Sequence, residues 1–186
     1  MTRADLVARL ADLVSEPILR VAVDGPDAAG KTTLADELAA ALGRPVLRVS
    51  IDDFHRPREE RYARGPLSPE GYVHDCFDFA ALRKAVLAPA GTVVVVDGVF
   101  LLSDHLRDCW DLTVFLDVHP AETLRRALVR DVALFGSEAV VRERYEHRYL
   151  PGQRLYRAMV NPTEVADVVV DNDDPAGPIV RKWPSR

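Results

Sequence analysis

Short apolar runs alternate along the chain with stretches whose apolar residues recur at helical spacing. The apolar runs are rich in β-branched residues, and they predict strands over residues 18–23, 46–51, 92–96, 112–118 and 166–170. The other stretches predict helices over residues 2–14, 31–42, 77–87, 122–135, 137–149 and 151–160. Strands that alternate with helices favour a parallel sheet covered on both faces. The pattern therefore predicts an α/β chain with a three-layer α/β/α fold around a five-stranded parallel sheet.

Two segments depart from this alternation. Residues 52–69 form a charged run with four arginines and three prolines, and they predict a long loop that serves as a lid, a binding segment or a linker. The aromatic residues Phe54 and Tyr62 favour the first two of these roles. The tail from residue 173 carries three prolines and predicts irregular structure.

The first predicted strand runs directly into a glycine-rich sequence. Residues 25–32 read Gly-Pro-Asp-Ala-Ala-Gly-Lys-Thr, a complete G-x-x-x-x-G-K-[ST] pattern. Its glycines let backbone N–H groups surround phosphate oxygens, Lys31 supplies positive charge for the β- and γ-phosphates, and Thr32 offers a hydroxyl to Mg²⁺. A chance glycine-rich turn is the alternative, but the strand before the motif and the helix after it favour a P-loop. The predicted cofactors are ATP and Mg²⁺, with nucleotide-binding residues Gly25, Asp27, Ala28, Ala29, Gly30, Lys31, Thr32 and Thr33.

Two further features suit a P-loop protein that transfers phosphate. A strand of four consecutive valines ends at Asp97, where a carboxylate would reach the Mg²⁺, although an Asp-Gly pair after a strand is also an ordinary turn. Arg126 and Arg130 are four residues apart and share one face of a predicted helix. Their mutual repulsion favours a cationic lid, around residues 122–149, that closes over the transferring phosphate; a solvated surface is the alternative.

Composition limits the classes of protein that remain. A length of 186 residues suits one domain, residues 1–186, and the net charge of −5 argues against a nucleic-acid partner. We expect no membrane partner and a cytoplasmic location, because no apolar stretch approaches the length of a membrane span or of a signal-peptide core. Two cysteines far apart disfavour a disulfide framework or a cysteine metal site. The oligomeric state is not decided, and a homo-oligomer stays open.

The motifs, in this order, resemble the uridine kinase-like family of P-loop small-molecule kinases, which is related to phosphoribulokinase, pantothenate kinase and nicotinamide riboside kinase. The resemblance covers nearly the whole chain and implies the P-loop nucleoside triphosphate hydrolase fold. It is carried by residues 25–33, 52–57 (Asp-Asp-Phe-His-Arg-Pro), 74–75, 77–78, 97–100 (Asp-Gly-Val-Phe), Arg126, 130–131, Tyr145, Tyr149, Pro151, Pro162 and 166–167.

The resemblance implies roles for particular residues. Asp52 would be the base that faces the acceptor hydroxyl, and Asp97 would stand near the Mg²⁺. The implied catalytic residues are Asp52, Lys31, Arg126 and Arg130; the implied acceptor-binding residues are Asp52, Arg56, Tyr72, His74 and Asp75; and the implied metal-binding residues are Thr32, Asp52 and Asp97. Because successive residues of a strand face opposite sides, we predict that Asp52, and not Asp53, faces the phosphate cleft.

Two features depart from the family pattern. Uridine kinases carry a base-recognition segment before the strand that ends at Asp97, whereas here residues 87–92 make only a short connection. Arg125 lies one position away from the usual arginine spacing.

Two classes of function follow from these residues. The first is an ATP-dependent kinase for a hydroxyl of a nucleoside-like molecule, with nicotinamide riboside, pantothenate or a sugar as alternative acceptors. The second is a non-catalytic nucleotide-binding regulatory module or GTP-binding switch, although the chain has no N-K-x-D sequence for guanine recognition.

Overall fold

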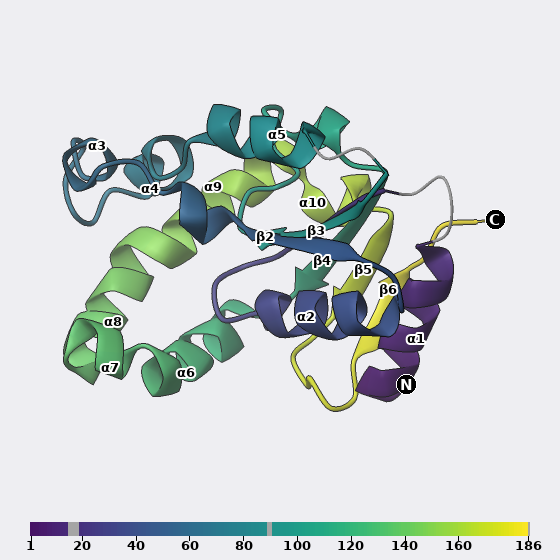
Figure 1. Cartoon of the computed structure of the whole chain (residues 1–186). Helices are drawn as coiled ribbons and strands as arrows, with labels where there is room; N and C mark the ends of the chain where they lie inside the picture. The colour runs from purple at the N-terminus through teal and green to yellow at the C-terminus, as the bar shows by residue number, and fades with distance from the viewer. Residues whose placement is uncertain (15–18, 89–90, 186) are drawn as a thin grey trace.

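The computed structural model describes residues 1–14, 19–88 and 91–185 (Figure 1). Within these residues the core is a six-stranded sheet with the strand order β2-β3-β1-β4-β5-β6. Five strands run parallel and β6 pairs antiparallel with β5. The strands are β1 (Arg20–Asp24), β2 (Val46–Ser50), β3 (Val93–Gly98), β4 (Leu112–Asp117), β5 (Val168–Asp171) and β6 (Ile179–Lys182). The five predicted parallel strands are confirmed, and the sheet has one strand more than predicted.

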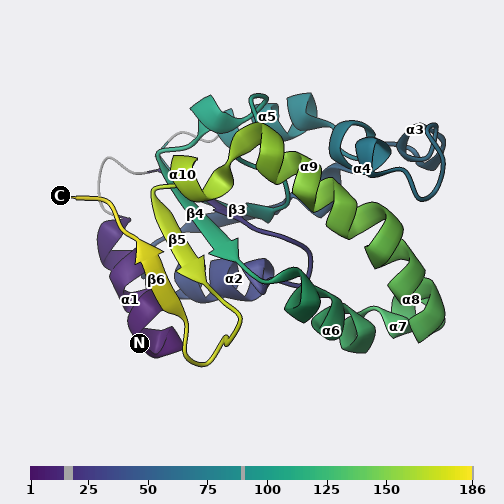
Figure 2. The same cartoon turned by 180° about the vertical axis from the view of Figure 1, so that it is seen from behind.

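Helices cover both faces of the sheet, as Figures 1 and 2 show. Alternate residues of β1 point to opposite faces: Val21 and Val23 pack in one core, and Ala22 packs in the other. The first core is covered by α1 (Arg3–Leu13) and α2 (Lys31–Ala41). The second is covered by α4 (Pro69–Asp75), α5 (Phe79–Leu87) and α9 (Leu150–Val160). These layers confirm the three-layer α/β/α architecture.

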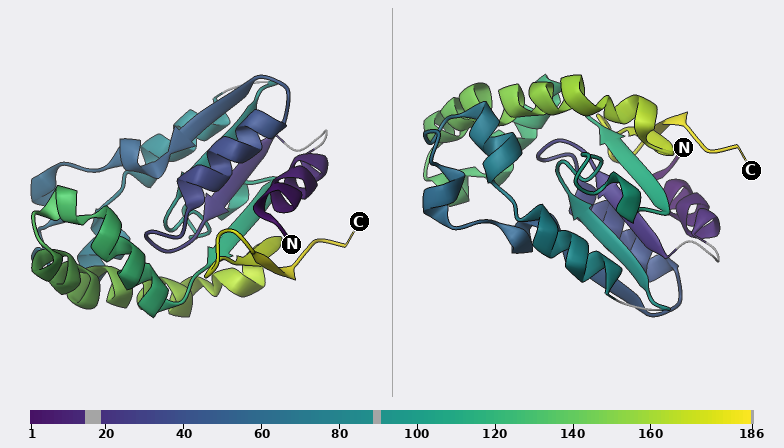
Figure 3. Two further views of the ribbon diagram at one scale, coloured as in Figure 1. Left: turned by 90° about the horizontal axis from the view of Figure 1, so that it is seen from below. Right: turned by 90° about the horizontal axis from the view of Figure 1, so that it is seen from above.

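A helical arm, residues 120–149, connects β4 to α9 and extends away from the sheet (Figure 2). Its elements are α6 (Pro120–Arg130), α7 (Val132–Phe135), α8 (Glu138–Arg144) and a π-helical turn (Tyr145–Tyr149). The helix predicted for residues 122–135 is therefore two helices, and it ends at Gly136 as predicted, with a φ of +91°. Figure 3 shows the arm curving toward α3 and α4. Buried Arg148 ties the two segments together, because its guanidinium donates to the carbonyl oxygens of Ser68 and Arg61.

The structure differs from the predictions in two other segments. The long loop predicted for residues 52–69 is partly helical, with a 3-10 turn, η1 (Ile51–Phe54), and helix α3 (Arg58–Arg61). The prediction of irregular structure from residue 173 onward is wrong for β6. This strand has only four residues and lies between two prolines, so it is too short to give a periodic signal. The remaining elements are η2 (Arg107–Cys109) and α10 (Pro162–Val165). No helix in the described ranges has the length and apolar character needed to cross a membrane.

Candidate active site

The glycine-rich sequence forms the turn between β1 and α2. Gly30 adopts a φ of +87°, a left-handed conformation that favours glycine, and α2 begins at the next residue, Lys31. Gly25 packs so closely against β4 that an added Cβ would lie 2.6 Å from the carbonyl oxygen of Leu116. The amino group of Lys31 donates to the carbonyl oxygen of Pro26 at 2.6 Å, and burial lowers its pKa. The local sequence thus places backbone N–H groups, a helix N-terminus and a lysine around one turn, which suits a bound phosphate.

Thr32, in the first turn of α2, contacts Asp97 at the carboxyl end of β3. The Thr32 hydroxyl donates to the Asp97 carboxylate at 2.6 Å, and Arg48 on β2 donates to the other oxygen of that carboxylate at 2.9 Å. Asp97 is buried on β3, which pairs with both β1 and β2. Parallel strands bring their carboxyl ends to one edge, so the sheet itself aligns the predicted metal-binding pair.

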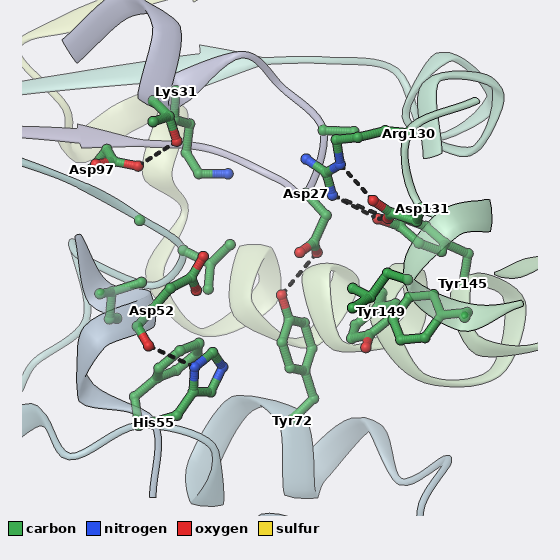
Figure 4. A pocket seen from close by; sticks show the side chains of 18 residues that line it. Asp27, Lys31, Asp52, His55, Tyr72, Asp97, Arg130, Asp131, Tyr145 and Tyr149 are labelled. Atoms are coloured by element: carbon green, nitrogen blue, oxygen red, sulfur yellow. Dashed lines mark hydrogen bonds and ion pairs between the residues drawn. The ribbon is translucent and has the colours of Figure 1, made fainter. Parts of the chain in front are cut away.

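A cavity of about 220 Å³ opens beside this pair (Figure 4). One side is lined by P-loop residues Asp27, Ala28, Lys31 and Thr32, together with Asp97. The other side is largely aromatic, and its lining includes His55, Tyr72, Phe77, Phe135, Tyr145 and Tyr149. Asp52 also lines the cavity, and Figure 4 shows its carboxylate directed into it, on the side of Asp97 and Lys31. The cavity therefore joins a phosphate-binding turn to an aromatic chamber, with a carboxylate beside both.

The 3-10 turn after β2, and not the strand itself, positions Asp52. Ser50 caps this turn by accepting a hydrogen bond from the backbone N–H of Asp52. Asp53 occupies the next position of the turn and does not line the cavity. Of the two carboxylates, only Asp52 faces the cavity, as predicted. The predicted reason, alternation along a strand, is wrong, because both residues lie in the 3-10 turn. Desolvation raises the pKa of the Asp52 carboxyl, while the positive charges of His55 and Lys31 act in the opposite direction.

Tyr72 connects the aromatic side of the cavity to the P-loop. Its hydroxyl donates to the Asp27 carboxylate at 2.8 Å, and the side-chain amide of Gln153 on α9 donates to the same oxygen at 3.3 Å. The rings of Tyr72 and Tyr149 pack edge to face, with centroids 4.9 Å apart. Asp27 is thereby held toward the aromatic side of the cavity, with its carboxylate in the cavity lining (Figure 4).

The two predicted lid arginines have different environments. Arg126 is largely buried, with 14% of its side chain exposed, and donates to the carbonyl oxygens of Ala28 and Asn172. It therefore anchors α6 to the backbone of the P-loop. Arg130 is 57% exposed, pairs with Asp131 at 2.6 Å and lines the cavity. Both guanidinium groups also line a surface hollow along P-loop residues 28–33. Arg125 pairs with Glu122 on the exposed side of the helix.

Three predicted acceptor-binding residues are not brought into the cavity. Arg56 donates to the carbonyl oxygen of Phe77, and Asp75 pairs with Arg64 at 2.6 Å. His74 lines a different cavity, on the other side of α4. Among the predicted acceptor-binding residues, the structure brings together Asp52 and Tyr72.

Asp24, directly before the P-loop, and His55, which lines the cavity, are two residues to which the sequence analysis gave no role. Asp24 is fully buried directly before the P-loop and accepts hydrogen bonds from the backbone N–H groups of Gly25 and Leu102 and from the hydroxyl of Tyr156. Burial raises the pKa of its carboxyl to about 6. His55 directs its ring toward the cavity, and its Nδ1 lies 2.8 Å from the backbone oxygen of Asp52. In the sequence, the signal for Asp24 is its position directly before the glycine-rich motif. The signal for His55 is its place in the 52–57 segment that carries the family resemblance.

The residues present fit a bound Mg²⁺. Thr32 and Asp97 are in contact and Asp52 lines the same cavity, a hydroxyl and two carboxylates of the kind that Mg²⁺ accepts. Within the described residues, no cluster of three or more acidic, histidine or cysteine side chains could hold a metal alone. Mg²⁺ usually binds through one or two carboxylates together with substrate phosphates and keeps several waters.

Comparison with known proteins relates this fold to the P-loop kinases. No protein-family model matches the chain. The uridine kinase of Chlamydia pneumoniae is 25% identical over 180 residues, which cover 81% of this chain and 80% of that protein. A structure of a possible uridine kinase from Bacillus stearothermophilus has a TM-score of 0.68 at 21% identity and covers 89% of this chain and 97% of its own.

A second solved structure has the same fold with a different acceptor in its name. D-glycerate 3-kinase from Cryptococcus neoformans has a TM-score of 0.58 at 13% identity, over 96% of both chains. The fold is that of the P-loop kinases. Within that class, sequence and structure together support the resemblance to the uridine kinase-like kinases.

Proposed function

We propose that this protein is an ATP-dependent kinase that transfers the γ-phosphate to a hydroxyl of a nucleoside-like small molecule. The observation that carries the proposal is the single cavity shared by Asp52, by the P-loop groups Lys31 and Thr32, and by an aromatic wall. A carboxylate beside both a phosphate site and an aromatic chamber is what phosphate transfer to an alcohol needs. A module that only binds nucleotide has no use for that carboxylate or for the chamber.

The P-loop side would bind and orient ATP. Backbone N–H groups around Gly30 and the charge of Lys31 would hold the β- and γ-phosphates. Thr32, Asp97 and Asp52 are the residues that would hold Mg²⁺, which supplies charge neutralisation on the phosphates when bound. Arg130, at the edge of the cavity, would add positive charge as the phosphoryl group moves.

The acceptor side would position the alcohol. Asp52 would accept the proton of the acceptor hydroxyl as its oxygen attacks the γ-phosphorus, and ADP would leave with the electrons of the broken P–O bond. Tyr72, Tyr149 and Phe77 offer apolar rings on which a sugar or a base can pack, and they exclude water that would compete as the nucleophile.

The helical arm would act as a lid. Arg126 and Arg148 anchor the arm at its two ends, to the P-loop and to the α3–α4 segment. Arg130 and the neighbouring Leu134 and Phe135 lie between these anchors and line the cavity, so a modest shift of this part would cover the phosphates.

The test is ATP turnover with a panel of alcohols, measured as ADP formation and compared with water alone. The panel holds uridine, cytidine, nicotinamide riboside, pantothenate and simple sugars. We expect at least one alcohol to raise ADP formation well above the rate in water. We also expect weak discrimination between uridine and cytidine, because the connection around residues 87–92 is too short for a base-recognition segment; residues 89–90 of it lie outside the described residues. Turnover that no alcohol stimulates would favour the nucleotide-binding module.

A further inference from the structure

A second cavity, of about 290 Å³, lies on the face of the sheet that α4, α5 and α9 cover. It is built by the end of α4, the start of α5, the loop after β3 and the last turns of α9. Its lining residues are Val73, His74, Phe79, Phe100, Ser103, Asp104, His105, Tyr156, Met159 and Val160. The size is near the lower end of ligand pockets, which run from about 300 to 1,000 Å³. It would hold a single small molecule rather than a whole nucleotide.

A wall of aromatic rings separates this cavity from the candidate active site. Phe100 packs edge to face on Tyr72, which lines the active site, at 4.9 Å between centroids. It also packs on Tyr156, which lines the second cavity, at 5.0 Å. Phe100 itself has a φ of +65°, a conformation that is costly for a bulky side chain and concentrates at functional sites. The second cavity is therefore a separate site and not an extension of the first.

The cavity combines apolar walls with a few hydrogen-bonding groups. The hydroxyl oxygen of Ser103 is buried and has no hydrogen-bond partner among the described residues. His74 and His105 line the exposed part of the cavity, and the His105 ring stacks on Phe79 with an interplanar angle of 12°. A buried unpaired hydroxyl and two accessible imidazoles beside aromatic rings are features that small-molecule sites combine.

The charges around the cavity narrow the class of ligand. Asp104 is paired with Arg107, and no lysine or arginine is among the lining residues. A phosphate group would therefore find no countercharge there. A flat ring with a polar edge suits both features, because its faces would pack on Phe100, Phe79 and Tyr156 while its edge bonds to Ser103 and the imidazoles.

We propose that this second cavity binds an uncharged heteroaromatic ring of nucleobase size, without phosphate. The inference does not depend on the proposed kinase activity, since it concerns a different cavity and its test measures binding alone.

Histidine signals in proton NMR spectra of the full chain give a direct test. His55 lines the active site, whereas His74 and His105 line the second cavity, so one spectrum reports on both. Uracil, adenine and nicotinamide are the probes, each titrated separately without nucleotide, and His74→Gln and His105→Gln assign the signals. We expect at least one probe to shift the His74 and His105 signals saturably, with a dissociation constant of roughly millimolar or tighter for a ligand of about ten atoms.

Two variants show where the probe binds. Met159 is 56% exposed at the rim of the cavity, so Met159→Lys should block entry without disturbing the core and weaken binding at least roughly tenfold. Ile179→Lys, at a 49% exposed position on β6, is the matched control and should bind like the wild type. Ser103→Ala should weaken binding by about five- to tenfold, because it removes one hydrogen-bonding group and adds no bulk.

Three results would overturn the proposal. The first is the absence of any saturable shift with all three probes. The second is a shift confined to His55, which would assign the binding to the active site. The third is binding that Met159→Lys leaves unchanged.

Discussion

The two sides of the candidate active site are built in different ways. The phosphate side comes from one continuous piece of chain, β1, the P-loop and the start of α2, closed by Asp97 from the neighbouring strand. The acceptor side collects Asp52, Tyr72, Phe77 and Tyr149 from four separate segments. One of these segments, the π-helical turn, belongs to the helical arm, and another, α4, contacts it. The phosphate side depends mainly on backbone geometry, and the acceptor side on side chains brought together by the tertiary fold.

This difference indicates that substrate specificity can vary on the acceptor side and not on the phosphate side. Every nucleoside triphosphate presents the same phosphates, so one local motif with fixed N–H groups serves all of them. Acceptors differ in shape, and their recognition depends on which rings and carboxylates the fold assembles. Substitutions on the phosphate side should therefore abolish turnover with any acceptor, whereas those on the acceptor side should spare nucleotide binding.

The largest effect is expected from Lys31→Ala. The β- and γ-phosphates lose a positive charge in a partly buried site, where it is worth most, and kcat should fall roughly a thousandfold. Steady-state kinetics with every alcohol that the wild type accepts is the measurement. Full activity in this variant would exclude the P-loop lysine from catalysis.

A smaller effect, confined to the acceptor side, is expected from Asp52→Asn. The change keeps the shape and removes the base, so kcat should fall roughly a hundredfold or more while ATP affinity stays near normal. Asp53→Asn is the matched control, because Asp53 lies in the same turn and does not line the cavity. A larger loss in the control would show that Asp53 is the base, and small losses in both would show that the base lies elsewhere.

Replacing an arginine of the arm should lower kcat about tenfold. Arg130→Ala should lower kcat by roughly that factor and ATP affinity less, because a half-exposed charge is partly screened by solvent. Arg126→Ala should lower kcat as well, but with a lower melting temperature, since it also loses the hydrogen bonds to the P-loop carbonyls. Thermal unfolding beside kinetics separates the two, and identical behaviour of both variants and the wild type would make these arginines ordinary surface residues.

The last effect is on stability instead of turnover and concerns Asp24, directly before the P-loop. Because the folded pKa of about 6 lies above the ordinary value of 3.8, the folded protein holds a proton that the unfolded chain releases. The resulting stability is complete below about pH 4 and is lost as the pH rises through 6, a change on the order of 3 kcal/mol. Urea unfolding from pH 4 to pH 7 should show this difference between the wild type and Asp24→Asn. A pH-independent difference between the two would contradict the raised pKa.

The same division explains what the sequence could predict. The P-loop and the parallel strands follow from local signals, a spaced motif and apolar runs rich in β-branched residues. The position of Asp97 could also be predicted, because it follows a run of four valines that reads as a strand. The residues of the acceptor side carry no such signal, since which side of α4 a residue faces depends on packing against α9 and the arm.

Two particular residues show this limit. His74 is two positions from Tyr72 on α4, and the helix turns it toward the second cavity while Tyr72 faces the first. Asp52 lines the cavity beside the P-loop, but strand alternation does not place it there, because the strand ends at Ser50 and a 3-10 turn follows. Local periodicity cannot anticipate such a turn.

The fate of the γ-phosphate is the most direct measurement of phosphate transfer across the two sides. Phosphorus NMR of wild-type protein with ATP, Mg²⁺ and the alcohol that stimulates ADP formation most would identify the product. We predict a new phosphomonoester that grows in step with ADP, and no such signal with Lys31→Ala. ADP accompanied only by inorganic phosphate, in the presence of every alcohol, would contradict a kinase that joins a P-loop to an acceptor chamber.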